Sequence, residues 1–416
     1  MRPSQTPPAA ARGPFDGARR AAWSDFLEGR LEVASRPFKA SIEITRNCNF
    51  KCNMCPQSWS PQYREYHPEL NMSPALFERL TREVFPRLEY AHLQGFGETT
   101  VSPHWPRILE LCRPFAGKLR FGLVTNLSRA GASTWRQMAD LGFHVIFSCD
   151  GVTRGTFETI RRGGRFEAIL ENLETLRRAR RESGKGELEL LVTLQGLNYR
   201  EMPDFVDFAE RYGASRITFA SVMGTLPASR KLLSPALWRR LTAARAVSQA
   251  RDLWRRAIAG KAPAAPFGNT AVGLHDCPAG ELARLKAETL RRSAARGIAV
   301  RFNDAYLTDM GEAFARRPAP PPPADFERGI EESVKVSLYQ RCFKPYSYVV
   351  INYRGDVGLC NHLITDSGWE QMGSLAVSSF DEIWNSEAYR EKRRRLISAQ
   401  PDNPSCQWCF KHRMTD

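Results

Sequence analysis

The stretch Cys48-Asn49-Phe50-Lys51-Cys52-Asn53-Met54-Cys55 places three thiols at the spacing C-x3-C-x2-C. It follows residues 40–44, Ala-Ser-Ile-Glu-Ile, whose alternation of apolar and polar side chains is typical of a β-strand. Thiolates are the ligands that iron-sulfur centres need, and three of them leave one iron of a four-iron cluster open. A zinc site would need a fourth Cys or His, and none lies within ten residues on either side. The loop therefore predicts an iron-sulfur site at the end of a strand.

The composition describes a large basic protein. Its 416 residues are enough for two domains, and 60 Lys and Arg against 45 Asp and Glu give a net charge of +15. The excess is spread over Arg-rich helical stretches such as 176–181 and 291–296, and it does not gather in one tail. We interpret it as a solvated basic surface, and we expect no nucleic-acid partner.

No segment of the sequence predicts a membrane or secretory protein. No run reaches the eighteen or more apolar residues of a membrane span, and the first thirteen residues lack the apolar core of a signal peptide. Ten cysteines in such a chain indicate metal or redox chemistry, because disulfides belong to oxidising compartments. We therefore expect a cytoplasmic protein without a membrane partner.

Strand-like and helix-like segments alternate through the first half of the chain. The strand-like segments are 40–44, 91–95, 119–125, 144–148, 188–195 and 215–220. The helix-like segments are 73–84, where Ser73 and Pro74 provide a cap and a first-turn proline, and 106–115, 133–141, 166–181 and 201–212. This order predicts an α/β fold, a partial (β/α)6 barrel with a parallel sheet. Its sites should lie at the carboxyl ends of the strands.

Composition also divides the chain into parts. The predicted parts are an N-terminal extension at 1–38 with a helix near 15–31, a barrel at 39–317, a Pro-rich linker at 318–339 and a small C-terminal domain at 340–416. Residues 225–275 interrupt the strand and helix rhythm and are predicted to be a helical insertion. This insertion either covers the barrel mouth or elaborates the periphery. The rhythm resumes with a helix at 281–296 and a strand at 299–302.

The cysteine loop resembles the signature of the radical S-adenosylmethionine (SAM) enzymes. The resemblance implies that the open iron of a 4Fe-4S cluster is chelated by the amino and carboxylate groups of SAM. It further implies that one electron, from a donor such as flavodoxin or ferredoxin, splits SAM into methionine and a 5'-deoxyadenosyl radical. That radical then takes a hydrogen atom from a substrate.

The segment Gly95-Phe96-Gly97-Glu98 follows the second predicted strand. Glycines let the backbone approach a ligand closely, and a carboxylate can hold an ammonium group. The segment is similar to the one that binds the SAM amino group in the family, which implies this role for Gly95, Gly97 and Glu98. Thr99 stands where many members have proline.

Further strand ends resemble family motifs. Thr125-Asn126 is similar to the Thr-Asn-Gly of relatives, with Leu127 in place of Gly, and Ser148-Cys149-Asp150-Gly151 is similar to a Ser-x-Asp-Gly segment. Residues 161–166, Arg-Arg-Gly-Gly-Arg-Phe, resemble an Arg-Gly-Gly turn, although such a turn is also an ordinary entry into a helix. The resemblance implies SAM contacts for Asn126, Ser148, Asp150, Arg162 and Gln195.

One cysteine outside the loop is a candidate catalytic residue. Cys149 ends a predicted strand near the expected radical, and a thiol there can donate a hydrogen atom to a substrate radical, as radical epimerases require. The alternative is a small packed residue.

A second set of cysteines follows the proline-rich linker. It consists of Cys342, Cys360, Cys406 and Cys409, spaced C-x17-C-x45-C-x2-C. Residues 348–352 and 356–359 predict a hairpin turned at 353–355, and 380–385 lead into a helix. Judged by residue types alone, four thiolates around a hairpin hold either zinc or an iron-sulfur cluster.

This C-terminal segment resembles the auxiliary-cluster extension of the SPASM/twitch radical SAM enzymes. The resemblance rests on Gly355-Asp356-Val357-x-x-Cys360 and on Glu382-Ile383-Trp384. Four cysteines match the short twitch form with one auxiliary 4Fe-4S cluster, as in aminocyclitol dehydrogenase. Full ligation by thiolates suits electron transfer, since no iron is left open for a substrate.

The resemblance therefore implies a radical SAM oxidoreductase with SAM and two 4Fe-4S clusters as cofactors. We expect it to dehydrogenate a sugar or cyclitol-type small molecule in natural-product biosynthesis. One alternative is modification of a precursor peptide, by crosslinking or epimerisation, although the 38 residues before the barrel are too few for a leader-recognition domain. A non-enzymatic alternative is a scaffold or binding protein with two zinc sites.

Overall fold

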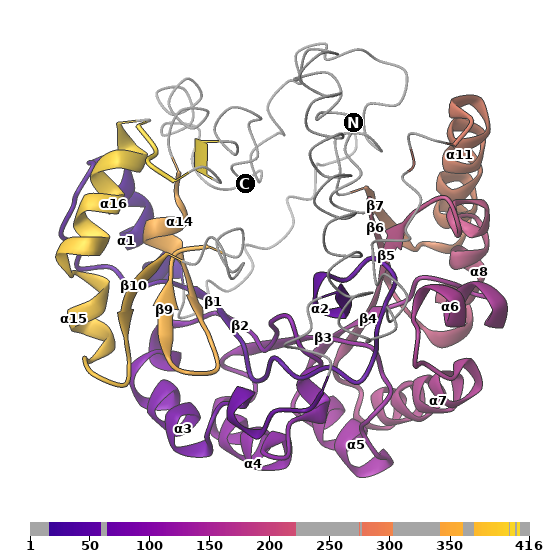
Figure 1. The fold of residues 1–416 in the computed structure, drawn as a ribbon, viewed down its shortest axis with the longest axis horizontal. Helices are drawn as coiled ribbons and strands as arrows, with labels where there is room; N and C mark the ends of the chain where they lie inside the picture. Colours follow the sequence, from indigo (N-terminus) through magenta and orange to yellow (C-terminus); the bar gives the residue numbers. More distant parts are fainter. Residues whose placement is uncertain are drawn as a thin grey trace, which may run out of the picture.

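A curved sheet forms the centre of the fold. Its strands are β1 (Lys39–Ile42), β2 (Tyr90–His92), β3 (Arg120–Thr125), β4 (His144–Ser148), β5 (Glu187–Leu194), β6 (Arg216–Ser221), β7 (Ala299–Phe302), β8 (Tyr348–Ile351), β9 (Asp356–Gly358) and β10 (Gln371–Ser374). They form one ten-stranded sheet in the order β10-β9-β8-β1-β2-β3-β4-β5-β6-β7. All neighbours from β8 through β1 to β7 are parallel, whereas β9 and β10 are antiparallel. The open half-barrel of Figure 1 confirms the predicted fold class.

The computed structural model describes residues 16–59, 65–221, 274, 277–302, 342–360, 370–398, 400–403 and 406–407. The predicted linker at 318–339 lies outside these residues, and so does the predicted insertion at 225–275 apart from Leu274. The division of the chain at these points therefore stays a prediction. Among the helices in the described ranges, none has the length and apolar character needed to cross a bilayer.

Helices cover the convex side of the parallel strands (Figure 1). They are α3 (Pro74–Glu83), α4 (Trp105–Cys112), α5 (Ala132–Asp140), α6 (Arg154–Ile160), α7 (Phe166–Ser183), α8 (Asp204–Tyr212) and α11 (Ala279–Arg296). The predicted cap of α3 is confirmed, because Ser73 Oγ accepts a hydrogen bond from Leu76 N at 3.2 Å. The predicted helix 106–115 ends early, at Cys112, because Pro114 cannot continue an α-helix and Arg113–Phe115 form a 3-10 turn.

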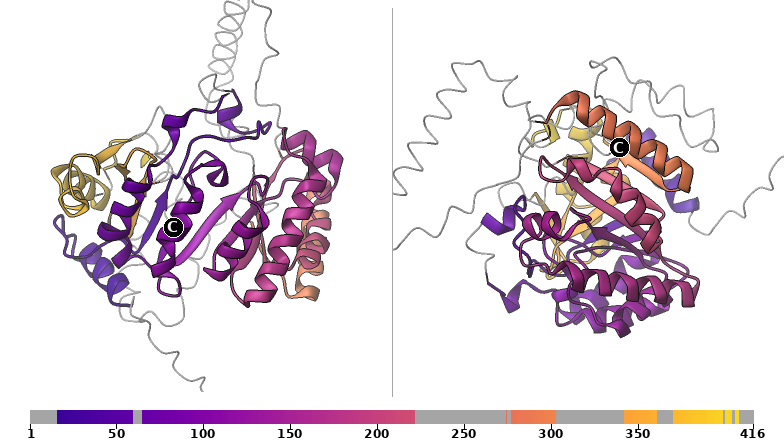
Figure 2. Two further views of the ribbon diagram at one scale, coloured as in Figure 1. Left: turned by 90° about the horizontal axis from the view of Figure 1, so that it is seen from below. Right: turned by 90° about the vertical axis from the view of Figure 1, so that its right-hand side faces the viewer.

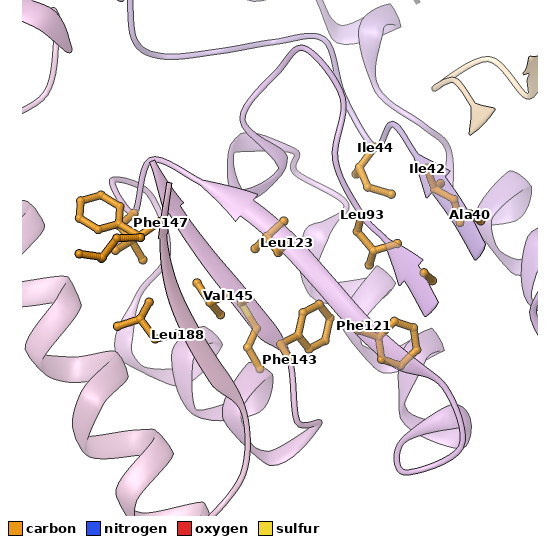
Figure 3. Packing of buried hydrophobic residues seen from close by; sticks show 14 of the residues in the cluster. Ala40, Ile42, Ile44, Leu93, Phe121, Leu123, Phe143, Val145, Phe147 and Leu188 are labelled. Carbon is orange, nitrogen blue, oxygen red and sulfur yellow. The ribbon is translucent and has the colours of Figure 1, made fainter. Parts of the chain in front are cut away.

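Apolar side chains fill the space between these helices and the sheet. Phe121 and Leu123 on β3 and Val145 and Phe147 on β4 alternate along their strands, and each is at most 1% exposed (Figure 3). The rings of Phe121 and Phe143 stack with their centroids 5.3 Å apart. Because this face packs against helices, the alternate residues of each strand face the concave side of the half-barrel.

The C-terminal hairpin extends the same sheet. β8 pairs with β1 in parallel register from Lys39–Tyr348 to Ile42–Ile351, so β1 is an internal strand between β2 and β8. The predicted turn is confirmed: Asn352 Oδ1 accepts hydrogen bonds from Arg354 N and Asp356 N, and Gly355 has a φ of +88°. The C-terminal segment and the barrel are therefore joined by main-chain hydrogen bonds.

The N-terminal segment packs against this C-terminal part of the fold. Helix α1 (Asp16–Leu27) confirms the helix predicted at 15–31 and packs against α14 (Lys344–Ser347). The same part of the fold contains α15 (Phe380–Trp384) and α16 (Glu387–Ile397) (Figures 1 and 2). Trp23 meets Phe343 edge to face at 4.7 Å between ring centroids, and Phe26 lies 5.2 Å from the same ring. Residues from both ends of the chain thus share one aromatic cluster.

Arg393 on α16 is the charged centre of this region. It is 0% exposed, and its guanidinium donates hydrogen bonds to four oxygens, those of Leu31 O, Pro345 O, Trp384 O and Asn385 Oδ1. It also lies 4.9 to 5.5 Å from three aromatic ring centres, those of Tyr346, Trp384 and Tyr389. Burial lowers the pKa of Arg393 to about 10, so the group remains a cation at neutral pH.

We expect Arg393→Met to lower the free energy of unfolding by about 3 kcal/mol, because four buried acceptors lose their donor. Urea unfolding of the apoprotein measures this effect. Arg394→Met is the matched control on the same helix, since Arg394 is 51% exposed and pairs with Glu391 one turn away. It should change the unfolding free energy by less than about 0.5 kcal/mol. Equal losses in the two variants would contradict a structural role of Arg393.

Candidate functional site

The loop with Cys48, Cys52 and Cys55 leaves the carboxyl end of β1, and loops from neighbouring strand ends hold it in place. Lys51 N donates a hydrogen bond to Arg162 O at 2.8 Å, in the segment between α6 and α7. Glu98 N, in the segment after β2, donates to Asn47 O at 2.9 Å. Main-chain hydrogen bonds thus fix the loop between two segments in which sequence motifs were predicted.

The two glycines of the motif after β2 make close approaches. A Cβ on Gly97 would lie 2.4 Å from Thr45 O and 2.5 Å from Asn47 O, both on the backbone that leads into the cysteine loop. A Cβ on Gly95 would lie 2.2 Å from Glu43 Cγ. Both positions need glycine because any side chain would displace the loop or the end of β1.

The three thiols of the loop interact electrostatically. Cys52 is 6% exposed, and Cys48 and Cys55 are half-buried. Burial raises the pKa of Cys48 to about 12, and the charges of Glu98, Cys52 and Cys55 act in the same direction. Within the described ranges no three His, Cys, Asp or Glu side chains are placed to hold a single metal ion. The cysteines that hold a cluster bind different iron atoms, so their sulfurs need not come close enough to share one ion. Three thiols spaced too widely for a single ion therefore fit a cluster.

The carboxylate of Glu98 is buried and bonded within the protein. Its Oε1 accepts hydrogen bonds from Thr125 Oγ1 at 2.7 Å and from Thr100 Oγ1 at 2.7 Å, and its Oε2 accepts one from Asn126 N at 2.6 Å. Burial raises the pKa of Glu98, and these hydrogen bonds oppose the rise. In this structure Glu98 joins the loops after β2 and β3, and its contact with the SAM amino group stays a prediction.

Asn126 lies beside the cysteine loop, as the motif predicts. Its Nδ2 donates to Asn49 Oδ1 at 3.1 Å. The next residue, Leu127, has a φ of +60°, which is the left-handed region that favours glycine. Leu127 is 0% exposed, and burial of its side chain offsets the backbone strain. This conformation explains why the resembling motif has glycine at the position.

The two arginines after α6 have different environments. Arg162, the predicted contact, has an exposed side chain, and its carbonyl binds the cysteine loop. Arg161 lies toward the loop: its Nε is 2.5 Å from Asp150 Oδ2, and its Nη1 donates to Cys52 Sγ at 3.6 Å. Burial raises the pKa of Asp150, and the Arg161 charge opposes this. Sequence reasoning missed Arg161 because adjacent arginines in a turn cannot be distinguished without the backbone path.

Two more predicted residues lie at the strand ends near the loop. Gln195 follows β5, is 0% exposed, and accepts a hydrogen bond at Oε1 from Asn53 Nδ2, between two of the loop cysteines, at 3.0 Å. Ser148 ends β4 and is 7% exposed. Four predicted residues are therefore bonded to the cysteine loop. Asn126 and Gln195 form hydrogen bonds to it directly. Glu98 is linked to it through Asn126, and Asp150 is linked to it through Arg161.

Cys149 is completely buried in the hydrophobic core. Its Sγ contacts Gly151 O at 3.6 Å, and burial raises its pKa. This environment is that of a packed thiol, and the catalytic role of Cys149 stays a prediction.

Two cysteines of the second set, Cys342 and Cys360, lie at the end of the β1–β8 pair where the two strands begin. β9 runs antiparallel to β8, so Cys360, two residues beyond β9, lies at the edge where β1 and β8 begin. Cys342 precedes α14 and β8. The ring of the next residue, Phe343, packs near the ring of Phe38, the residue before β1, with 6.2 Å between the ring centroids. Cys406 follows α16, and Cys409 lies outside the described residues. The four-residue length of β1, about 13 Å, separates this edge from the first loop.

A polar network lies on the concave face near the beginnings of the strands, where Tyr90 opens β2 and His144 opens β4. Tyr90 Oη is 3.5 Å from His144 Nδ1, His144 Nε2 is 3.1 Å from Glu189 Oε2, and Thr218 Oγ1 donates to Glu189 Oε1 at 2.6 Å. His92 Nε2 is buried without a hydrogen-bond partner among the described residues. Burial, together with the charge of His144, lowers the pKa of His92 to about 4. Sequence reasoning missed these residues, and their only signal is a polar side chain at alternate positions of a buried strand.

Comparison with known protein families identifies both cysteine regions. Residues 42–209 match the radical SAM superfamily, and residues 342–410 match the SPASM iron-sulfur cluster-binding domain. The second match includes all four C-terminal cysteines.

Curated relatives match about half of this chain, which spans about half of their length. The tungsten-containing aldehyde ferredoxin oxidoreductase cofactor-modifying protein of Pyrococcus furiosus is 24% identical over 195 residues, covering 45% of this chain and 52% of the relative. The GTP 3',8-cyclase of Synechococcus elongatus is 29% identical over 192 residues, covering 44% and 55%. The PqqA peptide cyclase of Methylorubrum extorquens is 28% identical over 199 residues, covering 46% and 47%.

Solved structures share the fold. SuiB of Streptococcus suis bound to precursor peptide SuiA superposes with a TM-score of 0.58 at 13% identity, covering 95% of this chain and 75% of SuiB. The enzyme anSMEcpe with bound SAM gives a TM-score of 0.54 at 14% identity, covering 91% and 88%.

The chain belongs to the radical SAM superfamily and carries a SPASM-type auxiliary cluster domain. Its cofactors are SAM and two 4Fe-4S clusters, one that binds SAM and one auxiliary. The assignment of Cys48, Cys52 and Cys55 to the SAM-binding cluster, and of Cys342, Cys360, Cys406 and Cys409 to the auxiliary cluster, stays a prediction.

We expect Gly97→Ala to remove the SAM-binding cluster, because a Cβ 2.4 Å from Thr45 O must displace the cysteine loop. Iron analysis after anaerobic reconstitution should fall from about eight to about four atoms per chain, with the auxiliary cluster kept. Gly155→Ala is the control, since a Cβ there meets nothing within 4 Å. Full iron content in Gly97→Ala would show that the close contact between residue 97 and Thr45 O is not required for binding of this cluster.

The lowered pKa of His92 predicts a pH effect on stability. The folded pKa of about 4 lies below the ordinary value of 6.5, so the unfolded chain binds more protons between these values and stability falls as pH drops below 6.5. Between pH 7 and pH 5 this costs at most about 2 kcal/mol. His92→Phe should remove that part of the loss in urea unfolding of the apoprotein. An unchanged pH dependence in the variant would contradict the assignment.

Proposed function

We propose that the protein is a radical SAM oxidoreductase that dehydrogenates an alcohol-bearing small molecule, such as a sugar or cyclitol, in natural-product biosynthesis. When bound, SAM and its cluster supply a 5'-deoxyadenosyl radical that removes a hydrogen atom from the substrate, and the auxiliary cluster takes up the second electron. The observation that supports the proposal is that the first cysteine loop follows the end of β1, whereas Cys342 and Cys360 lie where the β1–β8 pair begins. A substrate on the concave face would lie between them.

Residues of the first edge orient SAM in this proposal. Glu98 lies in the segment after β2, Asn126 and Gln195 directly follow β3 and β5, and Ser148 ends β4. Asn126 and Gln195 are hydrogen-bonded to the cysteine loop. Arg161 is added to the predicted set, because its guanidinium joins Asp150 to Cys52. A planar cation at this position suits the carboxylate of SAM.

The network on the concave face handles the proton in this proposal. Oxidation of an alcohol removes a hydrogen atom from carbon, an electron, and the hydroxyl proton. His144 is the proposed acceptor of that proton, because an imidazole nitrogen can take up a proton and His144 Nε2 lies 3.1 Å from the Glu189 carboxylate. Tyr90 Oη, beside His144 Nδ1, extends the chain of donors and acceptors toward the substrate.

A second candidate function is modification of a precursor peptide. The similarity to PqqA peptide cyclase, 28% identical over 199 residues, favours it. The concave face and both cysteine sets would serve the same roles, and the substrate would be a peptide side chain.

Either reaction needs a low-potential electron donor such as flavodoxin or ferredoxin. None of the nine described cysteines forms a disulfide, which suits a reducing cytoplasm.

Anaerobic reconstitution tests the reaction class. We expect about eight iron and eight sulfide per chain, and 5'-deoxyadenosine only when SAM and dithionite are both present. Cys48→Ala, Cys52→Ala and Cys55→Ala combined should abolish 5'-deoxyadenosine, whereas Cys360→Ala should keep it and lose substrate oxidation. Two zinc ions per chain and no SAM cleavage would support the scaffold alternative instead.

Deuterium transfer distinguishes the substrates. Sugars and aminocyclitols deuterated at a carbinol carbon should pass the label to 5'-deoxyadenosine and yield a ketone two mass units lighter than the unlabelled alcohol. Transfer from a deuterated peptide encoded beside the gene, with none from the alcohols, would favour the second function.

A further inference from the structure

A buried lysine joins two segments of the C-terminal domain. Lys392 on α16 is 3% exposed, and its Nζ lies 2.6 Å from Asp402 Oδ1 and in contact with Glu370 Oε1. Burial disfavours the ammonium, but the hydrogen bonds and charges of the two carboxylates outweigh it, so the pKa of Lys392 is raised. The lysine is therefore a cation held between two acidic residues from separate segments.

Glu370 lies next to the end of the hairpin that leads to Cys360. The following residue, Gln371, is the Cα partner of Gly358 in the antiparallel β9–β10 ladder. Gly358 ends β9 two residues before Cys360. A contact to Glu370 therefore fixes the strand that lies opposite the start of the Cys360 segment.

Asp402 belongs to the turn that leads to Cys406. Gln407 N donates to Asn403 O at 2.9 Å, and Gln407 Nε2 donates to Pro401 O at 3.1 Å, so Gln407 is bonded to both residues that flank Asp402. Gln400 N also donates to Arg395 O at 2.8 Å, which joins the start of this turn to α16. A contact to Asp402 therefore fixes the segment that carries Cys406.

We propose that Lys392 is a positioning residue for the auxiliary cluster, which holds the Cys406 turn against the hairpin that carries Cys360. The inference rests on the proposed assignment of Cys342, Cys360, Cys406 and Cys409 as ligands. The Lys392 ammonium is buried, whereas the side chains of Glu370 and Asp402 are 27% and 39% exposed. Burying this one cation costs desolvation free energy that an apolar residue of similar volume would not. The neighbouring Arg393 already joins α16 to the N-terminal segment. The use of Lys392 is to fix the distance between two cysteine-bearing segments.

The test uses the full chain with Cys48, Cys52 and Cys55 all changed to Ala, so that only the auxiliary cluster can form. After anaerobic reconstitution this background should hold about four iron atoms per chain. Adding Lys392→Met should reduce the iron at least fourfold and remove the electron paramagnetic resonance signal of the reduced cluster. Lys392→Arg should restore most of both, because it keeps the cation. Arg394→Met, the exposed control on the same helix, should leave both unchanged.

A second measurement separates positioning from folding. With the loop cysteines intact, Lys392→Met should still form the SAM-binding cluster and cleave SAM with dithionite at the unchanged rate. Full auxiliary iron with an unaltered signal in Lys392→Met would overturn the proposal, and so would equal loss of both clusters. If Lys392→Met is insoluble, Glu370→Gln with Asp402→Asn removes both anionic partners and should cause the same selective loss. A triple-Ala background without iron would refute the ligand assignment itself, and the role of Lys392 with it.

Discussion

The parallel pairing of β8 with β1 is the constraint on which the rest of the structure depends. It adds four paired positions and places β1 inside the sheet, with Ala40 and Ile42 at 0% exposure. Hydrogen bonds continue past both ends of the pair, from Phe38 N to Ser347 O and from Glu43 N to Ile351 O. Because the strands run the same way, the first cysteine loop follows the end of the pair, whereas Cys342 and Cys360 lie at its beginning. A main-chain ladder therefore sets the separation of the two cluster sites.

Side-chain contacts stabilise both ends of the β1–β8 strand pair. At the end near the cysteine loop, Arg46 pairs with Glu43 at 3.2 Å and lies 5.7 Å from the ring centres of both Phe96 and Tyr353. This contact joins the motif after β2 to the hairpin turn. Burial raises the pKa of Glu43, and the charge of Arg46 opposes the rise. At the other end, the rings of Trp23 and Phe38 from the N-terminal segment pack against Phe343, the residue after Cys342.

Local patterns in the sequence predict the local structure well. The strands predicted at 144–148 and 299–302 match β4 and β7 residue for residue, and the cysteine loop follows a strand as predicted. Pairing of β8 with β1 leaves no local mark, since the partners are about 300 residues apart and both have ordinary strand patterns. The choice between Arg161 and Arg162 depends on the path of one turn. The network of Tyr90, His144 and Glu189 arises only when separate strands align.

The internal position of β1 also governs the order in which the chain can fold. During synthesis β1 emerges early and pairs with β2, but its other edge has no partner until residue 348 has left the ribosome. For most of translation that edge presents unpaired N–H and C=O groups, which can template mispairing with other strands. Because the pairing of β8 with β1 closes a very long loop, it is also a late step in folding. The nascent barrel thus depends on the C-terminal strand β8 to pair with the free edge of β1, the strand that leads into the cysteine loop.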